Sequence, residues 1–302
     1  SRGLGDVYKR QSRTSAVSMI DLLGRIIGGK RLGNLAIEAD SLTKSLFDRI
    51  AGALPKSELI ATSGWVEDLR QIKDKDELQE IRRSIQMAEK AFLAVRAAMV
   101  PSQTEKMIAA DLEHRIRILG GVGCAFPPIV GVGLRAALPH AIPTERRIEE
   151  SPFVLIDWGA KAGRYLSDLT RVLVTGKIPP KLPRVYEVVL RAQLAAIAAI
   201  RPGVPASEVD RAARSVIEQA GHGKHFGHGL GHGFGLQIHE EPRMSASNDN
   251  ELRPGMVVTV EPGIYLAGWG GVRIEDDVLV TAEGHEVLTS LPKSFDSCRV
   301  TM

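Results

Sequence analysis

Apolar residues recur at helical spacing in the segment that follows residue 74 of the chain. Steps of three or four residues place them on one helix face, and they are Leu78, Ile81, Ile85, Ala88, Phe92 and Val95. This pattern predicts a long helix from about Asp76 to Met99, which Pro101 ends. Thr104 is then the expected N-cap of a second amphipathic helix that continues to about Leu119.

From residue 153 onward the pattern changes to short β-rich runs. "FVLIDWGA" and "LTRVLVTG" are two predicted strands joined by a turn that contains Gly163. Helices are predicted in "LPRVYEVVLRAQLAAIAAIRPG" and in "ASEVDRAARSVIEQAG", where Ser207 is the expected N-cap. Further strands follow in "GMVVTVEPGIYL" and "GGVRIEDDVLVTAEGHEVLT". Because a helix pair followed by strands occurs twice, we expect an internally duplicated α+β domain over residues 71–302.

Residues 1–70 are expected to form a separate and partial α/β domain. Strands are predicted over Leu35–Ile37 and Leu59–Ala61, with a helix between them that starts at an N-cap at Ser41 and ends near Ala53. This piece is short for a complete domain, so we expect it to be truncated. The first ~12 residues are interpreted as an artefact of a sequence boundary rather than as part of the fold.

The composition is that of a globular protein. Of the 302 residues, 44% are apolar and 25% are charged, and the formal net charge is +3. Basic residues are scattered, which argues against a nucleic-acid partner, and no apolar run reaches the ~18 residues of a membrane span. Cys124 and Cys298 lack metal-site or redox spacing, so we expect a reducing, cytoplasmic environment.

Histidines alternate with glycines in "HFGHGLGHGFGLQIHEEP", which spans residues 225–242. The stretch fits no phosphate-cradling G-x-G-x-x-G pattern, and "HEEPR" lacks the second histidine of a zincin helix. Glycine leaves space around each imidazole and allows close backbone approach. His228, His232 and His239 are therefore candidate site residues, whereas the alternative is a glycine-rich loop with bystander histidines.

Four carboxylates follow or interrupt β-rich runs, which predicts that they are drawn into the interior. They are Asp157, Asp168, Glu261 and Glu275, and Arg273 is a nearby cation. Buried carboxylates require compensating charge. Four of them carry −4, which two divalent ions neutralise, so the pattern predicts a two-metal site with a histidine ligand. Carboxylate-rich ligation favours Mn²⁺, with Co²⁺, Zn²⁺ and Fe²⁺ as alternatives.

Five motifs in this order resemble those of the pita-bread metallopeptidases, in the branch of Xaa-Pro aminopeptidases, prolidases and creatinase-like proteins. They are "LPHAIPTERRI", "LIDWGAKAGRYLSDLTRVLVTG", "HFGHGLGHGFGLQIHEEP", "LRPGMVVTVEPGIY" and "GVRIEDDVLVT". The resemblance implies a pita-bread fold with internal pseudo-duplication after a creatinase-like N-terminal domain. It also implies a metal set of Asp157, Asp168, His232, Glu261 and Glu275.

The resemblance further implies an exopeptidase that cleaves before proline through a hydroxide bridging two metal ions. The implied catalytic residues are His140, His228, His239, Glu261 and Arg273, with Glu261 also passing a proton to the leaving nitrogen. A peptide substrate with proline second and a homodimer are expected. The sequence does not decide between aminopeptidase activity and dipeptidase activity. Metal-free C–N hydrolysis of the creatinase type is a second possible function, and an inactive peptide-binding module is a third.

Overall fold

The computed structural model of the chain describes residues 17–30 and 32–300. The chain divides into two compact units, residues 1–66 and residues 67–302, which we call the N-terminal unit and the C-terminal unit. The domain boundary expected near residue 70 stays a prediction. The interpretation of the first ~12 residues as an artefact concerns residues outside the described ones.

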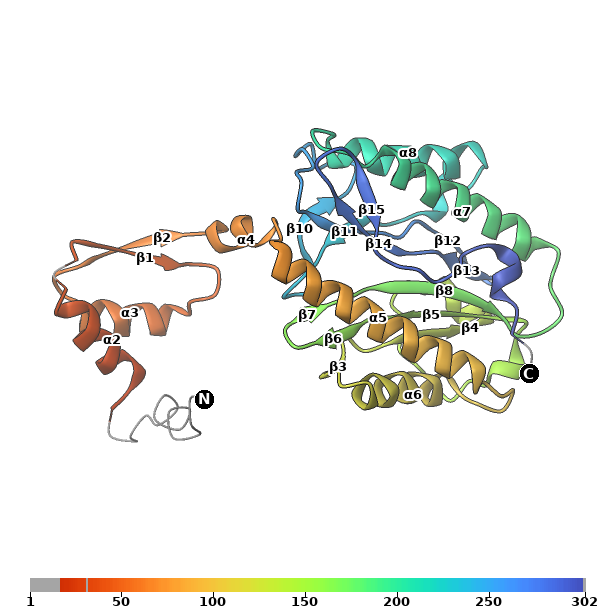
Figure 1. The fold of residues 1–302 in the computed structure, drawn as a ribbon, viewed down its shortest axis with the longest axis horizontal. Coiled ribbons are helices and arrows are strands. Elements are labelled where there is room, and N and C mark those ends of the chain that lie inside the picture. Colours follow the sequence, from red (N-terminus) through yellow and green to blue (C-terminus); the bar gives the residue numbers. More distant parts are fainter. Residues whose placement is uncertain (1–16, 31, 301–302) are drawn as a thin grey trace. The chain divides into compact units, whose positions relative to one another are not determined.

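From residue 17 to residue 62, the N-terminal unit shows a parallel pair of strands and two helices (Figure 1). The elements are α2 (Met19–Gly28), β1 (Asn34–Glu38), α3 (Lys44–Ala53) and β2 (Glu58–Thr62). Apolar side chains that include Ile20, Ile50 and Leu54 form its small core. The N-cap of α3 is Thr43, whose hydroxyl accepts a hydrogen bond from the Leu46 amide, so the prediction of Ser41 was wrong by two residues.

The C-terminal unit contains two helix pairs, each of which precedes a set of strands. The helices are α5 (Lys75–Ala97), α6 (Glu105–Ile118), α7 (Lys181–Ala199) and α8 (Ala206–Gln219). In Figure 1, α5 and α6 cover one side of the strands and α7 and α8 cover the other. This arrangement agrees with the duplicated order expected from the sequence. The short helix α4 (Trp65–Arg70) crosses the boundary between the two units.

Short antiparallel sheets make up the β-layer of the C-terminal unit. The strands of the first half are β3 (Gly123–Cys124), β4 (Ile129–Val132), β5 (Phe153–Trp158), β6 (Ala160–Ala162), β7 (Tyr165–Leu166) and β8 (Leu169–Val174). Those of the second half are β9 (Gly231–Gly233), β10 (Glu240–Met244), β11 (Val257–Val260), β12 (Gly263–Leu266), β13 (Gly270–Arg273), β14 (Asp276–Val280) and β15 (His285–Val287).

β5 is the central strand of the sheet β4-β5-β8 in the first half, and β11 is the central strand of the sheet β10-β9-β11-β14-β15 in the second. Asp157 on β5 lies opposite Thr170 on β8, and Val260 on β11 lies opposite Asp276 on β14. An isolated bridge between Thr170 and Glu275 joins the two halves. The halves therefore meet where several of the predicted metal ligands are located.

Each helix pair packs on the strands through its own apolar cluster. One cluster joins α5 and α6 to β4, β5 and β8, and Phe92 stacks on Trp158 within it at 4.2 Å between ring centroids. The other joins α7 and α8 to the second-half strands and to β5 and β8. Thr104 caps α6 as predicted, because its side chain accepts from the Met107 amide. Pro205, rather than Ser207, occupies the N-cap position of α8.

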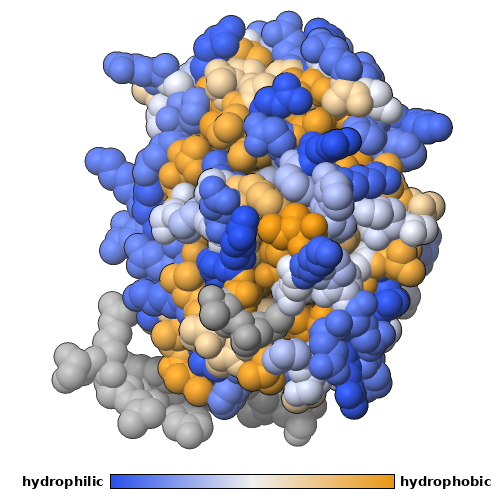
Figure 2. All heavy atoms as spheres, turned by 90° about the vertical axis from the view of Figure 1, so that its right-hand side faces the viewer, coloured by the Kyte–Doolittle hydropathy of each residue, from blue (hydrophilic) through white to orange (hydrophobic). Residues whose placement is uncertain are grey.

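Apolar residues also reach the surface of the molecule. On the face shown in Figure 2 they form groups between hydrophilic residues. Among the described residues, no helix combines the length and the apolar character that crossing a membrane requires.

Candidate metal centre

Three carboxylates from distant parts of the chain meet at the junction of the two halves. Asp157 lies on β5, Asp168 directly precedes β8, and Glu275 directly precedes β14. Each offers one oxygen, and these oxygens lie within 4.8 Å of one another. All three side chains are buried, with residue exposures of 7%, 5% and 1%. Glu275, more than 100 positions after Asp157 and Asp168, thus forms one cluster with them.

His232 and Glu261 complete a set of five potential ligands. His232, on β9, places its Nε2 atom 3.6 Å from Asp168 Oδ2 and 3.4 Å from Glu261 Oε1. Its other ring nitrogen, Nδ1, lies 3.0 Å from the carbonyl oxygen of Gly233. A carbonyl can only accept, so Nδ1 carries the proton and Nε2 is free to bind a metal ion.

Two neighbouring side chains fix the orientation of the carboxylates. Arg273, at the end of β13, donates from Nη2 to Asp157 Oδ2 and from Nε to the Thr170 hydroxyl. Thr170 in turn donates to Glu275 Oε2 at 2.5 Å. One oxygen of Asp157 and one of Glu275 are therefore held by the protein. The second Asp157 oxygen, Oδ1, is buried and has no hydrogen-bond partner among the described residues.

The electrostatics of this cluster disfavour four ionised carboxylates without added cations. Burial raises the pKa of Asp168 and of Glu275 well above the ordinary value, and the neighbouring carboxylates raise both further. Burial also raises the pKa of Glu261 to about 7, although Arg273 opposes this shift. Burial lowers the pKa of His232 to about 3, so its imidazole is neutral.

These observations fit divalent metal ions. The donor set is four carboxylates and one neutral imidazole, and the buried Asp157 Oδ1 atom lacks a partner among the described residues. Hard or borderline divalent cations prefer such donors. A divalent cation would also remove the repulsion that raises the pKa of Asp168 and Glu275.

A cavity of about 980 Å³ opens onto this cluster. Its lining includes all five potential ligands and three further histidines, His140, His228 and His239. His239 lies over His232, with the rings perpendicular and their centroids 4.4 Å apart. His140 and His239 are exposed in the cavity. The structure thus brings together every site residue that the sequence suggested.

His228 differs from the other two cavity histidines because both of its ring nitrogens have partners. Nδ1 lies 2.7 Å from the carbonyl of Gly229, and Nε2 lies 2.9 Å from the hydroxyl of Tyr265. Arg273 donates to the same hydroxyl at 2.8 Å. A chain of hydrogen bonds therefore connects His228 through Tyr265 and Arg273 to Asp157.

Sequence reasoning missed Tyr265 and Thr170. Tyr265 is the last residue of the motif "EPGIY", and Thr170 follows Asp168 by two positions in "SDLTR". Both lie within motifs that carry the family resemblance, but a tyrosine and a threonine in β-rich runs have the ordinary character of strand residues. Their role as hydrogen-bonding partners of charged groups depends on contacts with residues 8 to 105 positions away.

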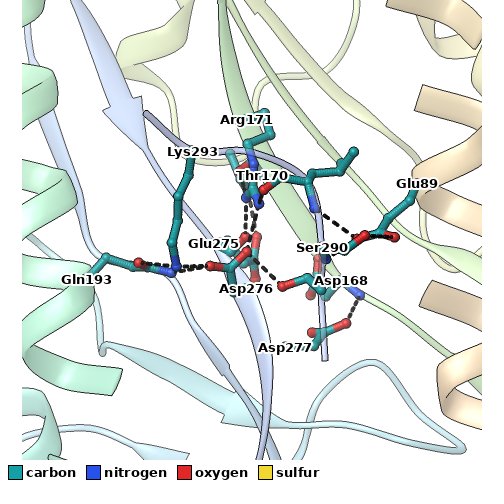
Figure 3. Close-up of polar contacts among 12 residues, drawn as sticks. Glu89, Asp168, Thr170, Arg171, Gln193, Glu275, Asp276, Asp277, Ser290 and Lys293 are labelled. Carbon is teal, nitrogen blue, oxygen red and sulfur yellow. Dashed lines mark hydrogen bonds and ion pairs between the residues drawn. The ribbon is translucent and has the colours of Figure 1, made fainter. Parts of the chain in front are cut away.

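A second buried ionic cluster, which we call the Asp276 cluster, forms around the residue that follows Glu275 (Figure 3). Asp276, next to Glu275, accepts hydrogen bonds from Arg171, Lys293, Gln193 and Thr289. Arg171 also donates to the main-chain carbonyl of Glu275. Burial alone would raise the pKa of Asp276, but Arg171 and Lys293 outweigh it, so the pKa is lowered. This cluster is neutralised by the protein's own cations.

Two family models match the chain. A family model described as metallopeptidase family M24 matches residues 79–282. The chain belongs to metallopeptidase family M24. A model of the creatinase/prolidase N-terminal domain also matches, over residues 3–72. This M24 chain is a metallo-exopeptidase, and the family implies divalent metal ions.

Named relatives and solved structures are similar over most of the chain. A Xaa-Pro dipeptidase of Pyrococcus furiosus is 43% identical over 88% of this chain and 76% of its own length. The crystal structure of an X-Pro aminopeptidase from Thermotoga maritima is 38% identical with a TM-score of 0.90, over 93% of this chain and 80% of the other. The structure of a Xaa-Pro dipeptidase from Bacillus anthracis is 41% identical with a TM-score of 0.89, over 92% of this chain and 78% of the other. These matches confirm the pita-bread fold with its creatinase-like N-terminal domain.

Proposed function

We propose that this M24 chain hydrolyses the peptide bond between an N-terminal residue and a following proline. The convergence of Asp157, Asp168 and Glu275 on one cavity is the observation that carries the proposal. The relatives named as Xaa-Pro dipeptidase and X-Pro aminopeptidase support the choice of substrate. We leave the distinction between dipeptidase and aminopeptidase to experiment, because relatives of both names match this chain equally well.

We propose that the site holds two divalent ions, most suitably Mn²⁺, with Co²⁺, Zn²⁺ and Fe²⁺ as alternatives. The proposed ligands are Asp157, Asp168, His232, Glu261 and Glu275. The four positive charges of two divalent ions equal the four negative charges of the carboxylates. The positive charge of Arg273 then remains, which would favour an anionic ligand. When bound, such ions would acidify a water molecule to a hydroxide nucleophile and polarise the scissile carbonyl.

The protein's own side chains are proposed to orient the ligands and the substrate. Arg273 and Thr170 hold one oxygen each of Asp157 and Glu275, which leaves the second oxygen of each directed to the cluster. His140 and His239 line the cavity, where an imidazole N–H can donate to the peptide carbonyl as charge develops on its oxygen. Glu261 is proposed to pass a proton to the leaving nitrogen.

His228 and Arg273 are proposed to act on the substrate side through the hydrogen-bonded chain that includes Tyr265. Because His228 Nδ1 faces a carbonyl, its proton is on Nδ1 and its Nε2 accepts from Tyr265. Burial lowers the pKa of His228 to about 4, so the ring stays neutral. This fixed arrangement gives the cavity a rigid wall next to the carboxylates.

A peptide panel in the presence of Mn²⁺ tests the proposed function. Cleavage of Xaa-Pro dipeptides alone indicates a dipeptidase, and cleavage of Xaa-Pro-Xaa tripeptides indicates an aminopeptidase. Matched peptides with alanine in place of proline, together with Met-Ala peptides, serve as controls. Equal or faster cleavage of the alanine peptides would contradict the proline preference.

Metal analysis of the same preparation separates the peptidase from the two metal-free functions. About two Mn-like ions per chain, with activity lost on chelation and regained on metal addition, are expected for the peptidase. Binding of no metal would instead favour creatinase-type C–N hydrolysis or an inactive peptide-binding module. We also propose a homodimer, which sedimentation analysis of the full chain tests.

A further inference from the structure

A buried ionic cluster outside the proposed metal set lies next to the histidine-bearing turn. Glu240 directly follows His239, and its side chain is 4% exposed. Its Oε1 atom accepts from Arg70 Nη2 at 2.6 Å and from Arg70 Nε at 3.0 Å. Its Oε2 atom accepts from Lys73 Nζ at 3.2 Å, and the Lys73 side chain is only 2% exposed. One carboxylate thus faces two cations from the start of the C-terminal unit.

The same carboxylate also fixes the main chain of the turn. Glu240 Oε1 accepts the Gln237 amide at 2.9 Å, and the Glu240 main chain pairs with Gly233 across β9 and β10. The turn between these strands contains Gly235 and ends with His239. Glycine gives a turn backbone wide conformational freedom, so a side chain that ties its two ends together restricts where the His239 ring can lie.

Gly235 is shaped to admit this ionic cluster. A Cβ atom at position 235 would lie 3.0 Å from Lys73 Cε and 3.2 Å from Glu240 Oε2, which is closer than a side chain tolerates without displacing them. The backbone of the turn therefore approaches the Lys73–Glu240 pair closely. A side chain at this position would require the ends of the Lys73 and Glu240 side chains to shift.

Stability alone does not account for such a cluster. Burying an ion pair costs desolvation that its attraction often only just offsets, so apolar residues would hold the turn equally well. What the charged groups add is a set of directional hydrogen bonds that define one conformation. His239, directly beside Glu240, is the cavity residue whose placement depends on that conformation.

We propose that Glu240, held by Arg70 and Lys73, is a positioning residue that sets the location of His239 over the metal cluster. The proposal rests on the proposed function, in which His239 donates to the substrate carbonyl. It assigns a role in the reaction to the segment of residues 70–73, which contributes no residue to the cavity lining.

Kinetics of four variants test the proposal, with an Xaa-Pro peptide and Mn²⁺. Glu240→Gln is expected to lower kcat/KM by about 10- to 100-fold, as loss of a supporting residue around a catalytic group does. Arg70→Met is expected to lower it in the same direction, and Arg70→Lys to restore most of the loss. Metal content should equal that of the wild type. The decisive comparison is Glu240→Gln in a His239→Ala background, where no further loss is expected.

Two control variants separate positioning from general weakening of the fold. Glu286→Gln removes a glutamate that pairs with Arg82 on the surface, and Ile217→Val removes a methyl group from the core of α8. Both are expected to keep kcat/KM within about twofold of the wild type, while Ile217→Val lowers thermal stability. A loss in Glu240→Gln no larger than that in Ile217→Val, or a full additional loss in the His239→Ala background, would overturn the proposal.

A spectroscopic measurement keeps the proposal testable independently of activity. In metal-free protein, the imidazole ¹H–¹⁵N signals of His239 are expected to shift or broaden in Glu240→Gln and Arg70→Met, and to remain unchanged in Ile217→Val. Unchanged His239 signals in both variants would refute the positioning role. If the wild type cleaves no Xaa-Pro peptide, the proposed function fails, while these spectra still decide whether Glu240 positions His239.

Discussion

Glu275 and Asp276 are neighbours in sequence, both are buried, and they have opposite electrostatic environments. Glu275 faces the cavity with three other carboxylates, and its pKa is raised by burial and by those carboxylates. Asp276 contacts Arg171 and Lys293, which outweigh burial and lower its pKa (Figure 3). We call Asp157, Asp168, Glu261 and Glu275 the front cluster and Asp276 the rear carboxylate. The protein's own cations neutralise Asp276, whereas the four carboxylates of the front cluster have only Arg273 as a cationic partner among the described residues.

This difference distinguishes a structural ionic cluster from a site that requires a ligand. Both clusters are rich in buried charge, so burial by itself does not identify a functional site. The balance of charge identifies the functional site. Asp276 has two cationic partners, whereas Arg273 is the one cation that contacts the front cluster among the described residues. The front cluster is therefore the one that fits divalent ions.

The largest expected effect is on the front cluster. We expect Asp168→Ala to abolish hydrolysis of Xaa-Pro peptides, on the order of 10³-fold or more, and to lower metal content, because it removes a proposed metal ligand. Peptide assays and metal analysis measure both. If this variant retained both activity and metal, the assignment of Asp168 as a ligand would be wrong.

Removing the rear carboxylate should instead destabilise the fold. Asp276→Asn leaves Arg171 and Lys293 buried without their anionic partner, which costs about 3–5 kcal/mol for a broken buried ion pair. Urea unfolding of the metal-free protein measures this loss. Asp168→Asn, which relieves like-charge repulsion, is the matched variant and should not destabilise the metal-free protein. Equal losses of unfolding free energy in both variants would contradict the claim that the two clusters differ in charge compensation.

The pH dependence of metal-free stability sharpens the same contrast. The pKa of Asp168 is raised in the folded state, so folded protein binds more protons than unfolded protein above about pH 4, and stability falls as pH rises. Asp276 has a lowered pKa, so its contribution is present above the unfolded pKa and is lost only as pH falls through the folded pKa.

We therefore expect the stability of Asp168→Asn relative to wild type to increase as the pH rises above the ordinary pKa of an aspartate. His228, whose pKa is lowered by burial, pairs with Gly229 and Tyr265 rather than with Asp168, so its contribution is the same in both proteins and cancels in this difference. Denaturant unfolding of both metal-free proteins at a series of pH values above the ordinary aspartate pKa provides the measurement. A difference that is constant with pH would show that Asp168 ionises normally.

The smallest expected effect concerns His228, which lies at the edge of the front cluster. His228→Ala removes the acceptor of the Tyr265 hydroxyl but no proposed metal ligand. Turnover should fall by about 10- to 100-fold, while metal content stays close to that of the wild type. Loss of metal from this variant would overturn its proposed substrate-side role.

Local patterns predicted the helices of the C-terminal unit well. The helix expected from about Asp76 to Met99 is observed as Lys75–Ala97, and Thr104 caps the next helix as predicted. The N-caps at Ser41 and Ser207 were wrong, because Thr43 and Pro205 take those positions. Several residue types can fill a cap, so the choice depends on where the chain enters the helix.

The sequence by itself determined the secondary-structure order, the family motifs and the identity of the candidate ligands, because spacing and residue type are local properties. Tertiary structure decided which groups balance which charges. Thr170 meets Glu275, Arg171 meets Asp276, and Arg70 meets Glu240 across more than 100 residues in each case. Electrostatic compensation depends on distances in space, which a linear pattern does not contain.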